Sequence, residues 1–241
     1  MDNSVYISLS RQIGLFQDLE FTSNNIANVN TPAYNAQKLL FSQYLQKTSD
    51  NRRDAYANTP TSYRDTTSGS IKTTGNTFDF AISGTGYFQI QTPLGSRYTR
   101  AGNFQVNDQG VLVNQDGYAV LGGDNSQILI PSNARNIEVN GAGLIRIDGV
   151  DGGQVGVFEF VNPQLMRRQG NNLYSATEPA TLTNTSRVLQ GSLESSNVSA
   201  ISETVRLLQL SRSVTNSAKL TDTVYELERK ASDVFTRPQN S

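Results

Sequence analysis

The sequence predicts a mainly β protein with a helix at each end: a central antiparallel all-β domain flanked by N- and C-terminal helices able to form coiled coils. Three observations predict this. Apolar residues near both ends recur with a period of 3.5, which is typical of helices that pack along a seam. Between them, short β-rich runs are separated by Gly, Asn and Asp. No run of apolar residues is long enough to span a membrane as a helix.

The first predicted element is a helix within residues 1–30. Its positions follow a ladder of alternating four- and three-residue steps, on which Gln12 and Ser23 are polar and the other members are apolar: Val5, Leu9, Phe16, Leu19 and Ile26. Pro32 ends the pattern, because proline lacks a backbone donor and forces the preceding residue out of the helical region. A helix from about residue 4 to 28 would be roughly 37 Å long.

Residues 31–68 are predicted to form a polar extended connector. The helical period is lost there, and Ser, Thr, Asn, Arg and Asp accumulate around Pro60. A short helical turn is predicted near Leu39 to Leu45.

Residues 69–191 predict an antiparallel β-domain. Short strands recur about every ten residues, which favours an antiparallel arrangement over a βαβ sheet. Residues 107–110 and 115–117 predict hairpin turns, since Gly and Asn tolerate the positive φ that such turns need. The predicted strands lie at 78–82, 86–90, 104–106, 111–113, 118–121, 127–130, 137–139, 144–147 and 155–161.

A second helix is predicted within residues 192–241, and we expect it to pair with the first. Asn197 or Ser199 can cap its start, and Glu203 suits the dipole of its first turn. Because a hairpin of two helices cannot bury both sides of each helix, part of this apolar surface is predicted to pack against other copies. Its apolar stripes are Ile201, Val205 and Leu208, then Leu220, Val224 and Leu227.

Composition excludes most site chemistry. Without His or Cys there is no Ser–His triad, no thiol nucleophile, no zinc finger and no disulfide. A net charge of −1 provides no field that would gather nucleic acid or anionic lipid. Catalysis by carboxylate, Lys, Tyr or hydroxyl groups remains open on composition, and we predict no cofactor, no metal, no nucleic-acid partner and no direct insertion into a membrane.

Two glycine-rich patterns have simpler explanations than ligand binding. Residues 84–86 begin like a dinucleotide loop, but a strand follows where the phosphate site needs a helix N-terminus. Residues 148–153 carry two aspartates that could bind calcium, yet the repeat that calcium β-rolls need is missing. A tight turn is the preferred interpretation of this second pattern.

Charged residues in the strands give two weaker candidates. Asp79, Glu159 and Glu178 could supply a carboxylate pair of the glycosidase type, although strand-edge solubility explains them better. Arg97 and Arg100 beside aromatic residues resemble a basic surface, but two arginines make a poor site for a polyanion.

Three segments of the chain carry recognisable motifs. The first is residues 23–32, Ser-Asn-Asn-Ile-Ala-Asn-Val-Asn-Thr-Pro. The second runs from residue 75 to 118, and the third, residues 190–198, is followed by a helix with Glu203 and Arg212. Together these segments resemble the flagellar basal-body rod and hook family. Residues 32–35 depart from its pattern, which has Gly and an aromatic–Lys pair after Asn-Thr.

The resemblance implies a structural subunit without catalysis, in the rod of the bacterial flagellar basal body. Residues 1–12 and the length are most similar to the proximal-rod member, and the distal-rod protein is the nearest alternative. Family members leave through the flagellar type III export apparatus without a cleaved signal peptide and polymerise as a tube across the periplasm. The implied partners are copies of the chain, inner proximal-rod proteins and the distal-rod protein.

We expect the terminal helices and the motif residues beside them to form the assembly interface. Besides the apolar residues named above, it includes Asn25, Asn28, Asn30, Asn197, Val198 and Arg212. A secreted carbohydrate-binding or adhesin-like β-protein is the alternative from a different class, and a carboxylate hydrolase is the third.

Overall fold

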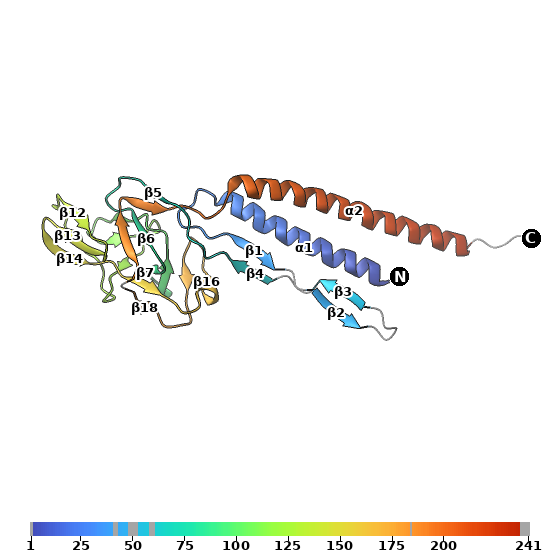
Figure 1. Ribbon diagram of the computed structural model, residues 1–241, viewed down its shortest axis with the longest axis horizontal. Coiled ribbons are helices and arrows are strands. Elements are labelled where there is room, and N and C mark those ends of the chain that lie inside the picture. Colours follow the sequence, from blue (N-terminus) through green and yellow to red (C-terminus); the bar gives the residue numbers. More distant parts are fainter. Residues whose placement is uncertain (1, 41–42, 48–52, 58–60, 184, 237–241) are drawn as a thin grey trace, which may run out of the picture. The chain divides into compact units, whose positions relative to one another are not determined.

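The computed structural model describes residues 2–40, 43–47, 53–57, 61–183 and 185–236 (Figure 1). The chain separates into two compact units. Unit 1 takes its residues from 1–27, 37–65 and 199–241, and unit 2 from 28–36 and 66–198. The fold is mainly β, with one helix near each end of the chain, as the sequence predicts.

Unit 1 combines two helices with two short β ribbons. Helix α1 (Asp2–Ala27) and helix α2 (Ala200–Thr236) pack along each other and run antiparallel (Figure 1). The ribbons are both antiparallel pairs: β1 (Gln37–Leu40) with β4 (Thr61–Arg64), and β2 (Gln43–Lys47) with β3 (Arg53–Ala57).

The helical turn predicted near Leu39 to Leu45 is wrong, because the described part of this stretch lies in β1 and β2. Leu39 is buried and pairs with Ser62 of β4. Pairing with a distant strand satisfies backbone groups that one isolated turn would leave open. The local sequence carries no sign of such a partner, since strand pairing depends on context more than on propensity.

The second helix begins at Ala200, later than residue 192. The preceding residues Ser192–Glu194 form strand β20, which pairs with β5 (Ile71–Thr73) in unit 2. Ser199 stands directly before α2, and its carbonyl accepts a hydrogen bond from the Glu203 N–H at 3.0 Å. Ser199 therefore occupies the N-cap position, and Glu203 lies in the first turn as predicted.

Unit 2 is built from antiparallel strand pairs. Its largest sheet has the order β16-β17-β8-β7-β15-β18, with β11 also on β7, and β12-β13-β14 form a second sheet. The remaining pairs are β6–β19, β9–β10 and β5–β20. The bounds are β6 (Phe80–Ser83), β7 (Tyr87–Thr92), β8 (Gly95–Thr99), β9 (Gln105–Val106), β10 (Leu112–Val113), β11 (Val120–Leu121), β12 (Ile137–Val139), β13 (Leu144–Ile147), β14 (Val150–Gln154), β15 (Val157–Glu159), the 3₁₀ turn η1 (Pro163–Leu165), β16 (Arg167–Arg168), β17 (Tyr174–Ser175), β18 (Thr181–Leu182) and β19 (Arg187–Gln190).

Both predicted hairpin turns are confirmed. Gly110 has a φ of 78° and donates its N–H to the Asn107 carbonyl, while Gly117 has a φ of 81° and donates to Asn114. The run at 127–130 is not a continuous strand, since it contributes single β-bridges from Gln127 and Leu129.

The core of unit 2 is one apolar cluster between these strands. Phe88 and Phe104 meet edge to face with ring centroids 5.3 Å apart. The buried members come from strands and the loops between them: Phe80, Ile82, Phe88, Ile90, Phe104, Leu112, Val120, Ile128, Ile130, Ile145, Val155, Val157, Leu173 and Val188.

A close backbone approach beside this core requires glycine at position 102. The Phe80 N–H donates to the Gly102 carbonyl at 2.9 Å, and a Cβ at position 102 would lie 1.8 Å from the Phe80 oxygen. We expect Gly102→Ala to reduce the free energy of unfolding by about 1–3 kcal/mol or more. Thermal unfolding followed by circular dichroism should show a fall of about 2–4 °C per kcal/mol.

Gly141→Ala is the matched control, because a Cβ there meets only the Arg187 side chain at 4.0 Å. Equal melting temperatures for the two variants would contradict the packing argument.

Candidate assembly surface and motif junction

The buried face of α1 is small and polar rather than apolar. Gly14, Asp18, Thr22 and Asn25 are buried, and their spacing places them on one side of the helix. Asp18 is 6% exposed and Asn25 is 1% exposed. Buried polar groups are costly unless they find partners, so each must be accounted for.

Two of these side chains hold neighbouring elements of unit 1. The Nη2 of Arg206 on α2 donates to both carboxylate oxygens of Asp18, at 2.8 and 3.1 Å. Asn25 binds the backbone of Gln37 at the start of β1, with Nδ2 donating to the carbonyl at 2.9 Å and Oδ1 accepting from the N–H at 3.0 Å. Polar contacts thus fix α2 and β1 to α1.

The apolar ladder faces away from this polar stripe. Leu9 and Phe16 on α1 are each 51% exposed, and Leu208 and Leu227 on α2 are 56% and 61% exposed. The other exposed members of the predicted interface are Asn30, Ile201, Val205, Arg212 and Leu220. Half-buried members are Leu19, Ile26, Asn28, Asn197 and Val198, Asn25 is buried, and the side chains of Val5 and Val224 lie outside the described ones.

Sequence reasoning missed two residues of this exposed surface. Ile13 is 49% exposed and lies four residues after Leu9 and three before Phe16, so it widens the apolar stripe of α1. Tyr225 is 54% exposed beside Leu227. Neither is on the ladder that the sequence predicts, which takes Gln12 as the position between Leu9 and Phe16, whereas the wider apolar stripe of an ordinary surface helix would have included Ile13.

The C-terminal part of helix α2 extends beyond the N-terminal end of α1. The helices have 37 and 26 residues, so their lengths are about 55 and 39 Å. Since they run antiparallel with Asp18 level with Arg206, Asp2 lies level with about residue 222. Residues 223–236 of α2 therefore extend roughly 20 Å beyond the first helix. Leu227 and Tyr225 lie on this extension.

The three sequence motifs meet within unit 2, at a place that we call the motif junction. It comprises residues 30–36, Thr67–Gly69, Arg100, Glu194 and Asn197. The Ala33 N–H donates to the Glu194 carbonyl at 2.8 Å. Asn197 accepts from the Ala36 N–H at 2.8 Å and donates to the Thr67 carbonyl at 2.9 Å. These bonds join the chain entering unit 2 to the chain leaving it.

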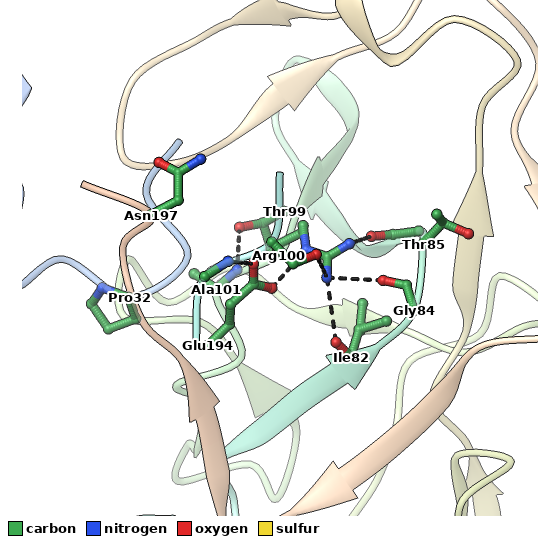
Figure 2. Close-up of polar contacts among 12 residues, drawn as sticks. Pro32, Ile82, Gly84, Thr85, Thr99, Arg100, Ala101, Glu194 and Asn197 are labelled. Carbon is green, nitrogen blue, oxygen red and sulfur yellow. Dashed lines mark hydrogen bonds and ion pairs between the residues drawn. The ribbon is translucent and has the colours of Figure 1, made fainter. Parts of the chain in front are cut away.

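A buried ion pair lies at the centre of the motif junction. The Nε of Arg100 on the chain after β8 donates to the Oε2 of Glu194 at 2.7 Å, and the two residues are 8% and 2% exposed (Figure 2). The other carboxylate oxygen accepts from the Gly69 N–H at 2.9 Å. The remaining guanidinium donors bind the carbonyls of Ile82, Gly84 and Gly86 and the Ser68 hydroxyl, at 3.1–3.3 Å.

These contacts give a structural role to two patterns for which the sequence does not favour ligand binding. Arg100 is no part of an exposed basic surface, because its charge is buried against Glu194. The Gly84-Thr85-Gly86 loop, with φ of 119° and 115° at its glycines, presents its carbonyls to Arg100. The signal for the pair was present in the sequence, because Arg100 lies in the second motif and Glu194 in the third, but nothing in the spacing linked them.

Carboxylates that the sequence offers as possible sites accept hydrogen bonds from the protein's own donors. Asp148 lies in the β13–β14 turn with a φ of 50° and accepts from the N–H groups of Arg135 and Asn136. Asp79 accepts from Thr74 and Asn76, and Glu178 from Asn162. Among the described residues, no group of three acidic residues could hold a metal, and no helix is apolar and long enough to cross a membrane.

Within the part of the chain that the structure describes, three side chains have shifted pKa values, each from a local cause. A hydrogen bond to Asp65 at 2.6 Å raises the pKa of Lys38 against the opposing effect of burial. Burial raises the pKa of Tyr98, whose ring lies 4.7 Å from that of Phe160. A hydrogen bond from the Ser126 hydroxyl lowers the pKa of Asp124.

Comparison with known proteins identifies matches along most of the chain. Residues 81–147 match the flagellar hook protein FlgE/F/G D1 domain, and residues 189–234 match the flagellar basal body rod FlgEFG protein C-terminal family. The chain is 32% identical to flagellar basal-body rod protein FlgF of Caulobacter vibrioides over 84% of its own length and 85% of the relative's.

Two further relatives are as similar. FlgF of Rhizobium meliloti is 34% identical, with 84% of this chain and 85% of the relative covered. FlgG of Bacillus subtilis, also a flagellar basal-body rod protein, is 33% identical, with coverages of 84% and 88%.

Removing one partner of the buried ion pair should strongly destabilise unit 2. We expect Glu194→Ala to cost about 3–5 kcal/mol, because it leaves the Arg100 charge buried without its counter-ion. Urea unfolding followed by tyrosine near-UV circular dichroism measures the loss. Replacing both residues with Met should restore part of the stability.

Asp151→Ala is the control, since it breaks an ion pair with Arg146 in which the two side chains are 62% and 58% exposed. That change should cost at most about 1 kcal/mol. A similar decrease in the free energy of unfolding in both alanine variants would contradict the large contribution of the buried pair to the stability of unit 2.

Proposed function

The chain belongs to the flagellar basal-body rod protein family, and on that premise we propose that it is a proximal-rod subunit, of the kind named protein F, that polymerises through α1 and α2. The family is a structural one and is not a known enzyme family. Its members lie in the flagellar basal body and assemble with other rod and hook components. The chain is thus a structural rod subunit.

The observation that carries the assembly mode is the exposed apolar ladder on both helices. Leu9, Phe16, Leu208 and Leu227 are all at least half exposed in the single chain. Each large apolar side chain gains about 1.5–3 kcal/mol on full burial, so such a surface favours packing against further helices. Copies of the chain supply those helices, and their interleaving in coiled-coil fashion would transmit torque along the rod.

The extension of α2 supports intermolecular rather than internal packing. Beyond about residue 222 no part of α1 lies alongside, yet Tyr225 and Leu227 continue the apolar surface. A helix on a neighbouring subunit can cover them. The proposed partners are copies of the chain, inner proximal-rod proteins on one side and the distal-rod protein on the other.

Assignment to the proximal rod rests on the opening residues, 1–12, and on the two FlgF relatives. The FlgG relative is equally similar, so the distal rod is the competing position. Passage through the flagellar type III export apparatus without a cleaved signal peptide belongs to the same proposal.

Replacing an apolar ladder residue with a charge should abolish rod completion without unfolding unit 2. Leu208→Asp and Leu227→Asp place a carboxylate where a neighbouring helix would bury it, and such a charge has no partner there. Swimming in soft agar, together with electron microscopy of isolated basal bodies, should show a complete loss. The thermal unfolding of unit 2 should be unchanged.

Leu94→Asp is the matched control, because Leu94 is 79% exposed at the β7–β8 turn of unit 2. It should leave swimming intact. Full motility of the α2 variants would refute the assembly surface.

Deleting the gene of the cell's other rod protein of the FlgF or FlgG kind should distinguish the two rod positions. A rod that grows outward from the inner proximal-rod proteins can take up a proximal subunit without the distal-rod protein, so the chain should remain in basal bodies purified from that strain. Immunoblots of purified basal bodies against the chain measure this. Loss of the chain from those basal bodies would assign it to the distal rod instead, because a distal subunit would have no proximal rod to bind.

A further inference from the structure

We propose that the Asp18–Arg206 ion pair is the residue pair that sets the register of α1 against α2, and with it the position of the apolar ladders that the subunit presents. Only the predicted effect on rod assembly rests on the proposed function. The role of the pair in setting the register within one chain does not depend on it.

Asp18 is a buried carboxylate on a helix face that is otherwise small or neutral. It is 6% exposed, and both of its oxygens accept from the Nη2 of Arg206. The neighbouring buried residues on that face, Gly14 and Thr22, carry no charge. Removing a carboxylate from water is costly, and here Arg206 is the cation that offsets the cost.

Only one antiparallel alignment of the helices allows this contact. A slip of one helical turn would move Arg206 by about 5.4 Å along the axis, which breaks both hydrogen bonds and leaves the Asp18 charge buried without a counter-ion. The stability that the ion pair contributes is therefore lost when the helices slip out of this register, as happens with polar residues placed in coiled-coil seams.

The exposed apolar side chains of α1 cannot supply the same selectivity. Leu9, Ile13 and Phe16 are each about half exposed, so they gain little from any particular alignment with α2. Apolar contacts are also non-directional, and a stripe with regular spacing fits its partner in more than one register. The buried contacts on the Asp18 face of α1 must therefore decide the register of the two helices.

The same pair disfavours the wrong face of α1. If an apolar ladder of a neighbouring copy docked on the Gly14–Asp18–Thr22 face, it would cover the Asp18 carboxylate without offering a cation. The ion pair thus keeps that face for α2 of the same chain. It leaves Leu9, Ile13 and Phe16 as the surface available to other copies.

Spin labels can measure the register directly, because the chain has no native Cys. Ser23→Cys and Asn216→Cys introduce labels at exposed positions on α1 and α2 that are separated along the axis. Pulsed electron paramagnetic resonance on the purified full chain should give one narrow distance distribution. Asp18→Arg or Arg206→Asp should broaden it or shift it by about one turn, 5.4 Å. The double reversal should restore it.

The neutral pair Asp18→Asn with Arg206→Gln covers the case in which a reversed charge prevents folding. It removes the ions and keeps hydrogen-bonding groups, so it should give a distribution broader than the parent's. Glu20→Arg is the matched control, since it makes the same charge change at an exposed position of α1. Unchanged distances in the Asp18 and Arg206 variants, or a broad distribution in the parent, would overturn the proposal.

Motility then tests the consequence in assembly. Each single reversal should abolish swimming, and the double reversal in one chain should restore it. Co-expression of the two single variants should not, because the pair forms within a chain; restoration there would overturn the intrachain assignment. If the labels behave as expected while neither these variants nor Leu227→Asp affect swimming, the register pair stands and the proposed function fails.

Discussion

The ion pair between Arg100 and Glu194 is the contact on which the organisation of the chain depends. Its guanidinium donates to four parts of the chain: Glu194 in β20, Ile82 in β6, the Gly84–Gly86 loop, and Ser68 in the segment that leads into β5. The carboxylate in turn accepts from the Gly69 backbone. A planar group with fixed donors suits this task, since a flexible ammonium could not meet so many acceptors at once.

The two units use polarity in opposite ways. Unit 2 follows the usual rule of an apolar core, and the buried Arg100–Glu194 pair lies where separate chain segments converge. Unit 1 places Asp18, Thr22 and Asn25 inside and leaves most described members of its apolar ladder exposed. This arrangement suits the assembly proposed above, because directional polar contacts hold the helices of one chain together while the apolar surface remains available.

The sequence predicts the elements better than it predicts their partners. Periodicity identifies both helices, and Gly110 and Gly117 identify two hairpin turns of unit 2, because these signals are local. The strands β1 and β4 escape detection since each is defined by the other, across some twenty intervening residues. The same limit applies to the candidate site: the exposed ladder is visible as a pattern, whereas Arg100 and Glu194 meet only through the folded backbone.

Unit 1 is assembled from three separate stretches of chain, and the last of them is α2. A chain that is synthesised or delivered from its N-terminus therefore completes unit 2 before Arg206 becomes available to Asp18. Closing so long a loop is slow compared with forming hairpins inside unit 2. The helix pair is consequently expected to form last. Because α2 lies at the C-terminal end of the polypeptide, the helix pair that presents the apolar ladders forms only after unit 2 has folded.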